Sequence, residues 1–104
     1  MKRILIADDE PHMARVLQQV LERAGYAVQT TRNGLEALQA VRDRQPDILV
    51  TDIQMPVMTG KTLCETLAVE LPGRKFPICF TEQSFVLRLC FAVQPGWVCY
   101  RPTR

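Results

Sequence analysis

Three aspartates stand where two short apolar runs end. Asp8 and Asp9 directly follow the run at residues 3–7, and Asp52 follows the run at residues 47–51. If these runs are neighbouring parallel strands, the three carboxylates converge at one edge of a sheet, where sites lie in open α/β sheets. Carboxylates in one shallow pocket repel one another and raise at least one pKa, unless a cation joins them. Oxygen ligands with room for water suit Mg²⁺.

Asp52 is also placed for covalent chemistry. A carboxylate next to a bound divalent ion, on a turn that exposes it, is a competent nucleophile toward a phosphoryl group. Turn signals follow at once, because Met55-Pro56 and Gly60 come at short distances after Asp52. A plainer interpretation stands beside this one. An aspartate near a helix N-terminus is stabilised by the helix dipole, so each carboxylate taken alone could be only a helix cap.

The elements that would position these carboxylates alternate between strand and helix. Apolar runs bounded by turn signals predict strands over residues 3–7, 26–30, 47–51 and 77–81. Apolar residues at helical spacing predict three helices. They are expected over residues 11–24, between the turn at Asn33-Gly34 and the stop at Gln45-Pro46, and from after Gly60 to Leu71. Such alternation implies βαβ units and parallel pairing. The predicted fold class is α/β with a doubly wound parallel sheet.

Composition limits the function classes. The 104 residues fit a single domain, and a net charge of +2 with interspersed signs leaves no basic stripe for nucleic acid. The first apolar run is too short for a signal peptide, and no segment nears the ~20 apolar residues of a membrane span. We therefore expect a cytoplasmic domain that binds neither nucleic acid nor membrane directly. Four cysteines without a close pair, and a single histidine, indicate free thiols rather than a zinc site or a disulfide framework.

Three groups of residues carry a family likeness: Asp8-Asp9, Asn33-Gly34-Leu-Glu36-Ala37-Leu38, and Asp52-x-x-Met55-Pro56-x-Met58-x-Gly60. Together they resemble the receiver domain of two-component response regulators. The likeness covers residues 2 to about 78. It implies the flavodoxin-like receiver topology and a domain that accepts phosphoryl groups in signal transduction rather than an enzyme.

The resemblance also implies a role for each site residue. Asp52 would be the phosphoacceptor, and a sensor histidine kinase or a phosphotransfer protein would donate the group from a phosphohistidine. Asp8, Asp9 and Asp52 would place Mg²⁺. The backbone carbonyl of Gln54 would be a further metal ligand, and its side chain would influence how long the phosphoryl group survives hydrolysis. Family members bind the kinase through the first helix, whose exposed side here is expected to carry His12, Arg15, Gln19 and Glu22.

The last quarter of the chain departs from the family pattern. Thr81 lies near the place of the Ser or Thr that should bond the phosphoryl oxygen, in a strand that is one residue short. Arg101 stands in place of the family's Lys, and its planar guanidinium is not equivalent to a point donor. The expected fifth helix is absent, and aromatic residues crowd the tail, with all four Phe and the only Trp after residue 75. Exposed aromatics would favour a homodimer or aggregation.

Two accounts of this tail stay open. In one, residues 1–104 are a single receiver domain in which residues 1–78 are family-like and residues 79–104 are divergent, with an impaired switch. In the other, an altered reading frame or a truncation has replaced the residues after about 78.

Two functions also stay open. One is a Mg²⁺-dependent phosphoacceptor, and the other is a module that binds protein partners independently of phosphorylation. A small hydrolase that uses Asp52 is a weaker third option, because nothing resembles a substrate pocket or a dedicated general base.

Overall fold

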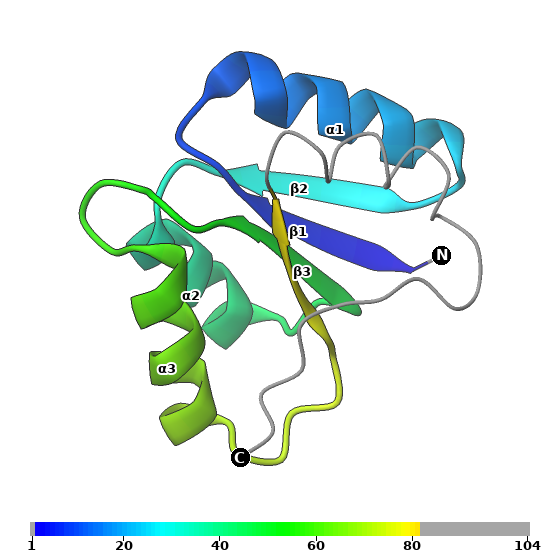
Figure 1. Cartoon of the computed structure of the whole chain (residues 1–104). Helices are drawn as coiled ribbons and strands as arrows, with labels where there is room; N and C mark the ends of the chain where they lie inside the picture. The colour runs from blue at the N-terminus through cyan, green and yellow to red at the C-terminus, as the bar shows by residue number, and fades with distance from the viewer. Residues whose placement is uncertain (1, 82–104) are drawn as a thin grey trace.

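Within residues 2–81, which the computed structural model describes, four parallel strands form one sheet (Figure 1). The strands are β1 (Arg3–Ala7), β2 (Ala27–Thr31), β3 (Ile48–Asp52) and β4 (Ile78–Thr81). Their order in the sheet is β2-β1-β3-β4, and each neighbouring pair is parallel. Because the chain moves from β1 outward to β2 and then crosses back to β3 on the other side, the sheet is doubly wound, as the sequence predicted.

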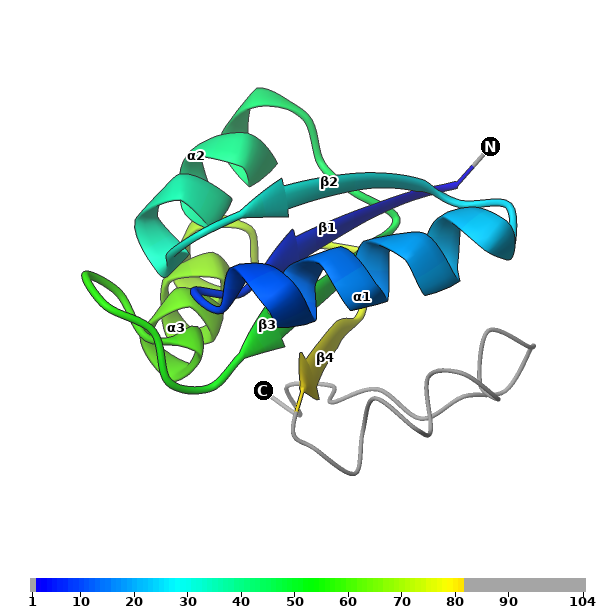
Figure 2. The ribbon, with the colours of Figure 1, turned by 90° about the horizontal axis from the view of Figure 1, so that it is seen from above.

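Helices cover both faces of this sheet. α1 (Pro11–Arg23) packs on one face, and α2 (Gly34–Asp43) and α3 (Gly60–Glu70) pack on the other (Figure 1, Figure 2). Side chains alternate between the faces of a strand, so each strand contributes to two cores. Leu5 and Leu49 pack under α2 and α3. Ile6 and Val50 pack under α1, together with the fully buried Leu17 and Leu21 of that helix.

Local signals begin and end the helices. Pro11 opens α1 at its first turn, where a missing N–H costs nothing. Gly25 follows the end of α1 with a φ of +97°, the left-handed conformation that glycine adopts without strain. The Asn33 side chain caps α2 by accepting the Glu36 N–H at 2.8 Å. Thr59 caps α3 in the same way, accepting the Thr62 N–H at 3.1 Å.

Three strands differ from their predicted bounds by one residue, since β2 and β3 are displaced as a whole and β4 begins at Ile78 rather than at residue 77. Strand β3 was expected at residues 47–51 and lies at Ile48–Asp52, because Asp52 pairs in register with Thr81 of β4. Strand β2 likewise lies at Ala27–Thr31 rather than at residues 26–30. Helix α1 was expected at residues 11–24, but it ends at Arg23 and leaves Ala24 exposed. Asp52 is thus the last residue of its strand and is held by the sheet itself.

Several expectations concern residues that the structure does not describe. Of the predicted tail, residues 79–81 belong to β4, whereas Arg101 and the expected absence of a fifth helix lie outside the described residues. Cys64 is a free, buried thiol. Cys79 is disulfide-bonded, so the expectation of free thiols is wrong there. Spacing along the chain does not reveal which sulfurs the fold brings together.

Among residues 2–81, no helix is long and apolar enough to cross a membrane.

The two faces of α3 provide a test of where the core lies. Leu67 is fully buried, whereas the Val69 side chain is 81% exposed. We expect Leu67→Ala to lower the free energy of unfolding by about 2–5 kcal/mol, because it removes buried methyl groups and leaves a cavity. Val69→Ala should change it by no more than about 0.5 kcal/mol. Urea denaturation measures both, and equal losses would contradict this assignment of the core.

Candidate functional site

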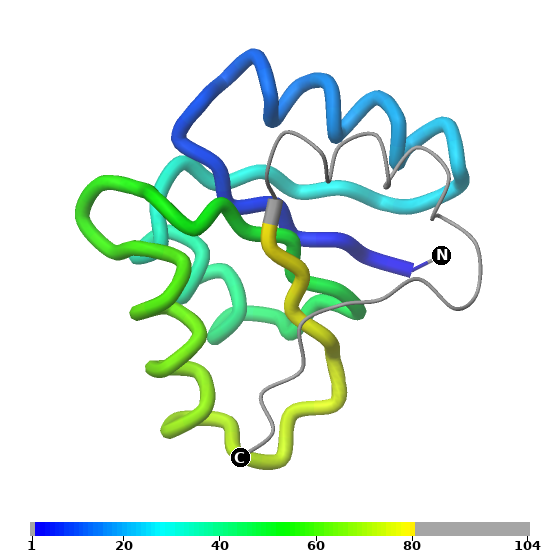
Figure 3. The backbone as a smooth tube through the Cα atoms, viewed as in Figure 1, coloured from blue at the N-terminus to red at the C-terminus, as the bar shows by residue number. Residues whose placement is uncertain are grey.

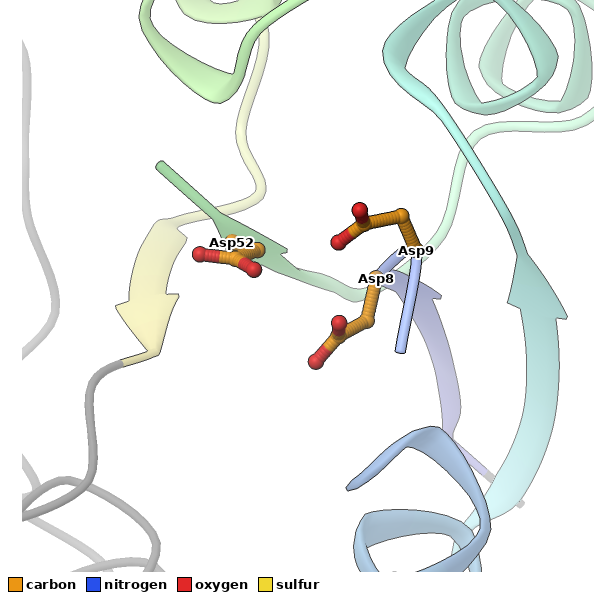
Figure 4. Close-up of side chains that lie close together, drawn as sticks. All are labelled: Asp8, Asp9 and Asp52. Atoms are coloured by element: carbon orange, nitrogen blue, oxygen red, sulfur yellow. The ribbon is translucent and has the colours of Figure 1, made fainter. Parts of the chain in front are cut away.

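Three carboxylates meet at the carboxyl end of the two central strands. Asp8 and Asp9 follow β1, Asp52 ends β3, and β1 and β3 are direct neighbours in the sheet. Figure 3 shows that the turns after these two strands lie at the same end of the sheet. One oxygen from each carboxylate lies within 4.8 Å of the others, and Figure 4 shows the three side chains together at this edge. The structure therefore brings together the three aspartates that sequence analysis selected.

The three side chains differ in their access to solvent. Asp8 is only 3% exposed, Asp52 is partly buried and Asp9 is exposed. The cluster is thus a shallow site that is buried at the bottom, at Asp8, and open to solvent on one side, at Asp9. A ligand can reach it from solvent, while the sheet holds Asp8 and Asp52 in place.

Backbone N–H groups orient two of the carboxylates. Oδ1 of Asp8 accepts the Glu10 N–H at 2.9 Å. Oδ1 of Asp52 accepts the Gln54 N–H at 3.3 Å. Each is a turn in which a side chain bonds the backbone two residues further on. Within residues 2–81, no hydrogen bond engages the second oxygen of either side chain, so that oxygen remains available to a cation.

The electrostatics of the site are unfavourable without a cation. Burial raises the pKa of Asp8 above its ordinary value, and the negative charges of Asp52, Asp9 and Glu10 raise it further. The hydrogen bond from the Glu10 backbone opposes this shift. Three hard oxygen donors, an open side for water and an excess of negative charge together fit Mg²⁺, which keeps several waters and takes one or two carboxylates. Asp8, Asp9 and Asp52 are the residues that could hold it.

The loop that follows Asp52, residues 53–59, is packed closely against the end of β3. The Gly60 N–H donates to the Ile53 carbonyl at 2.9 Å. A Cβ on Gly60 would lie 2.1 Å from the Asp52 carbonyl oxygen, so a side chain there would displace the backbone of the site residue. In the sequence, Gly60 is recognisable only as a turn signal and a motif residue. Its short distance along the chain from Asp52 is the one sequence feature that indicates its close packing against the Asp52 backbone.

The remaining predicted site residues occupy different positions. Gln54 is exposed, two residues beyond Asp52. Thr81 is the last residue of β4 and pairs with Asp52 across the sheet. Arg101 lies outside residues 2–81. On α1, the structure exposes all four residues expected on its outer side, namely His12, Arg15, Gln19 and Glu22.

Comparison with known proteins identifies relatives of this arrangement. The family model of the response regulator receiver domain matches residues 4–85. The alkaline phosphatase synthesis transcriptional regulatory protein PhoP of Bacillus subtilis is 41% identical over 66 residues, which cover 64% of this chain and 28% of PhoP. The polar-differentiation response regulator DivK of Brucella anthropi is 32% identical over 77 residues, which cover 74% of this chain and 63% of DivK. The chain thus spans less than two thirds of either relative.

Solved structures show the same fold. The response regulator protein TrrA of Thermotoga maritima, in complex with Mg²⁺–BeF, superposes with a TM-score of 0.71 at 28% identity. The superposition covers 97% of this chain and 88% of TrrA. The parallel sheet with helices on both faces is therefore the receiver type of flavodoxin-like fold.

Replacement of Asp8 should show the electrostatic cost of the cluster. A carboxyl with a raised pKa binds its proton more tightly in the folded state, so its contribution to stability falls as the pH rises. For wild-type protein in EDTA this fall runs from about the ordinary pKa of 3.8 through the raised value. We therefore expect Asp8→Asn to be more stable than wild type at neutral pH, by a margin that grows over this pH range and is constant above it.

Urea denaturation at a series of pH values measures this margin. Glu65→Gln removes one negative charge from the exposed surface of α3 and is the matched control. The control should show no comparable gain in stability. A wild-type protein as stable as Asp8→Asn at every pH would contradict the account of charge repulsion.

Proposed function

The chain belongs to the response regulator receiver domain family, and we propose that it is a Mg²⁺-dependent phosphoacceptor that carries the phosphoryl group on Asp52. The cluster of three carboxylates within 4.8 Å at the carboxyl end of β1 and β3 is the observation that carries this proposal. The donor would be a phosphohistidine on a sensor histidine kinase or a phosphotransfer protein. The Mg²⁺–BeF complex of TrrA supports the same metal for this chain.

The chain's own residues would act mainly by position and charge. Asp8, held by the Glu10 N–H, and the exposed Asp9 would place the metal together with Asp52 and the Gln54 carbonyl. When bound, Mg²⁺ neutralises the negative charge that gathers as phosphoryl oxygens approach the carboxylates. An oxygen of Asp52 would then form a bond to phosphorus while the bond from phosphorus to the donor imidazole nitrogen breaks. The imidazole leaves with the electron pair of that bond.

Two further residues would sense the phosphoryl group. Thr81 pairs with Asp52, and neighbouring strands lie about 4.8 Å apart. This position supports its proposed role in binding a phosphoryl oxygen. Arg101 is proposed to supply the positive charge for which the family uses Lys. Because Arg presents a planar fork of donors, we expect the coupling between phosphorylation and conformation to be weakened.

The exposed side of α1 is the proposed surface for the phosphoryl donor. α1 begins two residues after Asp9, so its first turn lies beside the site. His12 and Arg15 are exposed there.

Formation of a homodimer remains a prediction. The division of the chain into a family-like part at residues 1–78 and a divergent tail also remains a prediction.

Phosphorylation by a small acyl-phosphate donor tests the proposal. With Mg²⁺ present, we expect intact-mass spectrometry to show one added phosphoryl group on the wild-type chain. Asp52→Asn should add none, because it lacks the nucleophile. Chelation of Mg²⁺ should slow labelling on the order of 100-fold, since several kcal/mol of charge stabilisation are lost.

Asp43→Asn is the matched control, because Asp43 is an exposed aspartate at the end of α2. It should be labelled as fast as wild type. Labelling of Asp52→Asn would remove Asp52 from its role. Partner binding that is indifferent to Mg²⁺, to the donor and to Asp52 would instead favour the alternative function, a phosphorylation-independent interaction module.

A further inference from the structure

We propose that Gly34, the first residue of α2, is a positioning residue for the site. It holds the loop of residues 53–59, which carries Gln54, in a strained conformation that a larger residue would release. This inference rests on the proposed function, because its consequence for the protein is the placement of the Gln54 carbonyl toward Mg²⁺.

The first observation is a close contact between α2 and the loop. Gly34 is buried, and its N–H donates to the Met58 carbonyl at 3.1 Å. A Cβ on Gly34 would lie 2.4 Å from the Met58 carbonyl oxygen and 2.8 Å from both Cβ and Cγ of Met58. One of these atoms belongs to the backbone, so a flexible side chain cannot relieve the overlap by turning away. Glycine alone permits this approach.

The second observation is backbone strain at the neighbouring residue. Val57 has a φ of +69°, and it is the only non-glycine residue with positive φ within residues 2–81. The Met58 N–H donates to the Pro56 carbonyl at 2.7 Å, across the single residue Val57. A hydrogen bond over two positions with positive φ at the centre is the rare, strained form of the γ-turn. A β-branched residue is among the least suited to it.

The strain has no local compensation at Val57 itself. Its side chain is 76% exposed and gains little from packing. Strained backbone persists only where surrounding contacts determine it. Here those contacts come from both sides of the turn. Met55 is buried before it, and Met58 packs against the core after it and accepts the bond from Gly34.

A side chain at Gly34 would therefore displace Met58 and with it the loop that carries Gln54. The Gln54 N–H bonds the Asp52 carboxylate, and Gly60 fits against the Asp52 backbone, so both ends of the loop are tied to the site. The γ-turn at Val57 lies between these two attachment points. Its relaxation would change the direction of the Gln54 carbonyl. Removal of a group that orients a metal ligand typically lowers metal affinity 10- to 100-fold.

A Mg²⁺ titration followed by amide NMR tests the inference, because it reads binding without any phosphorylation. We expect Gly34→Ala to weaken Mg²⁺ binding by about tenfold. Alanine is the better helix former, so the change tests the contact with Met58 rather than the stability of α2. Gly73→Ala is the matched control, because a Cβ on Gly73 meets nothing within 4 Å. It should bind Mg²⁺ as wild type does.

A rescue separates positioning from simple packing. Glycine adopts positive φ without strain, so Val57→Gly lets the turn absorb the shift of Met58 while Gln54 keeps its place. We expect the double variant Gly34→Ala/Val57→Gly to bind Mg²⁺ within about threefold of Val57→Gly alone, a difference well under the expected tenfold loss. If Gly34→Ala fails to fold, Val57→Gly must restore its folding.

Three results would overturn the inference: wild-type Mg²⁺ affinity in a folded Gly34→Ala protein, a double variant that binds no better than Gly34→Ala, or a double variant that stays unfolded. Failure of the proposed function looks different. Wild-type protein in which Mg²⁺ shifts no amide near Asp8, Asp9 or Asp52 would refute the metal site itself.

Discussion

Parallel pairing of β1 with β3 is the constraint on which the site depends. The register sets Ala7 opposite Thr51, so the residues that follow, Asp8 and Asp52, emerge side by side. The sheet is buried on both faces and cannot slip to move these carboxylates apart without exposing its apolar residues. Hydrophobic burial thus holds three negative charges within 4.8 Å of one another. The same burial raises the pKa of Asp8. The cluster could therefore hold a cation.

Glycines complete the site where side chains would not fit. Gly60 allows α3 to begin against the backbone of Asp52, and Gly34 allows α2 to begin against the loop of residues 53–59. The loop is therefore held from two helices on the same face of the sheet. α2 and α3 are joined further by the paired side chains of Arg42 and Glu70 at their far ends. The pair is exposed, so its contribution to stability is small.

Membership of the receiver family gives these features a shared purpose. In the proposed function, Asp52 as acceptor, Asp8 and Asp9 as metal ligands and the Gln54 carbonyl would act by position and charge, with little further chemistry required of the protein. The chain spans only 28% of PhoP and 63% of DivK, so the activity of a whole protein does not follow from this domain. The matched residues extend to 85 and so include all of β4.

The local sequence determined which segments form strands and helices and which residues are candidates for the functional site. Apolar runs, Pro11 and Gly25 marked strands and helix ends because these signals act through neighbours along the chain, and three aspartates at strand ends were found in the same way. Boundaries moved by one residue at β3, since the partner strand decides where pairing stops.

Only the tertiary structure decided which strands are neighbours, which aspartate is buried, that Cys79 is bonded, and that Gly34 contacts Met58 across 24 positions of sequence. These are contacts between distant segments, and their energies exist only once the sheet and helices have packed.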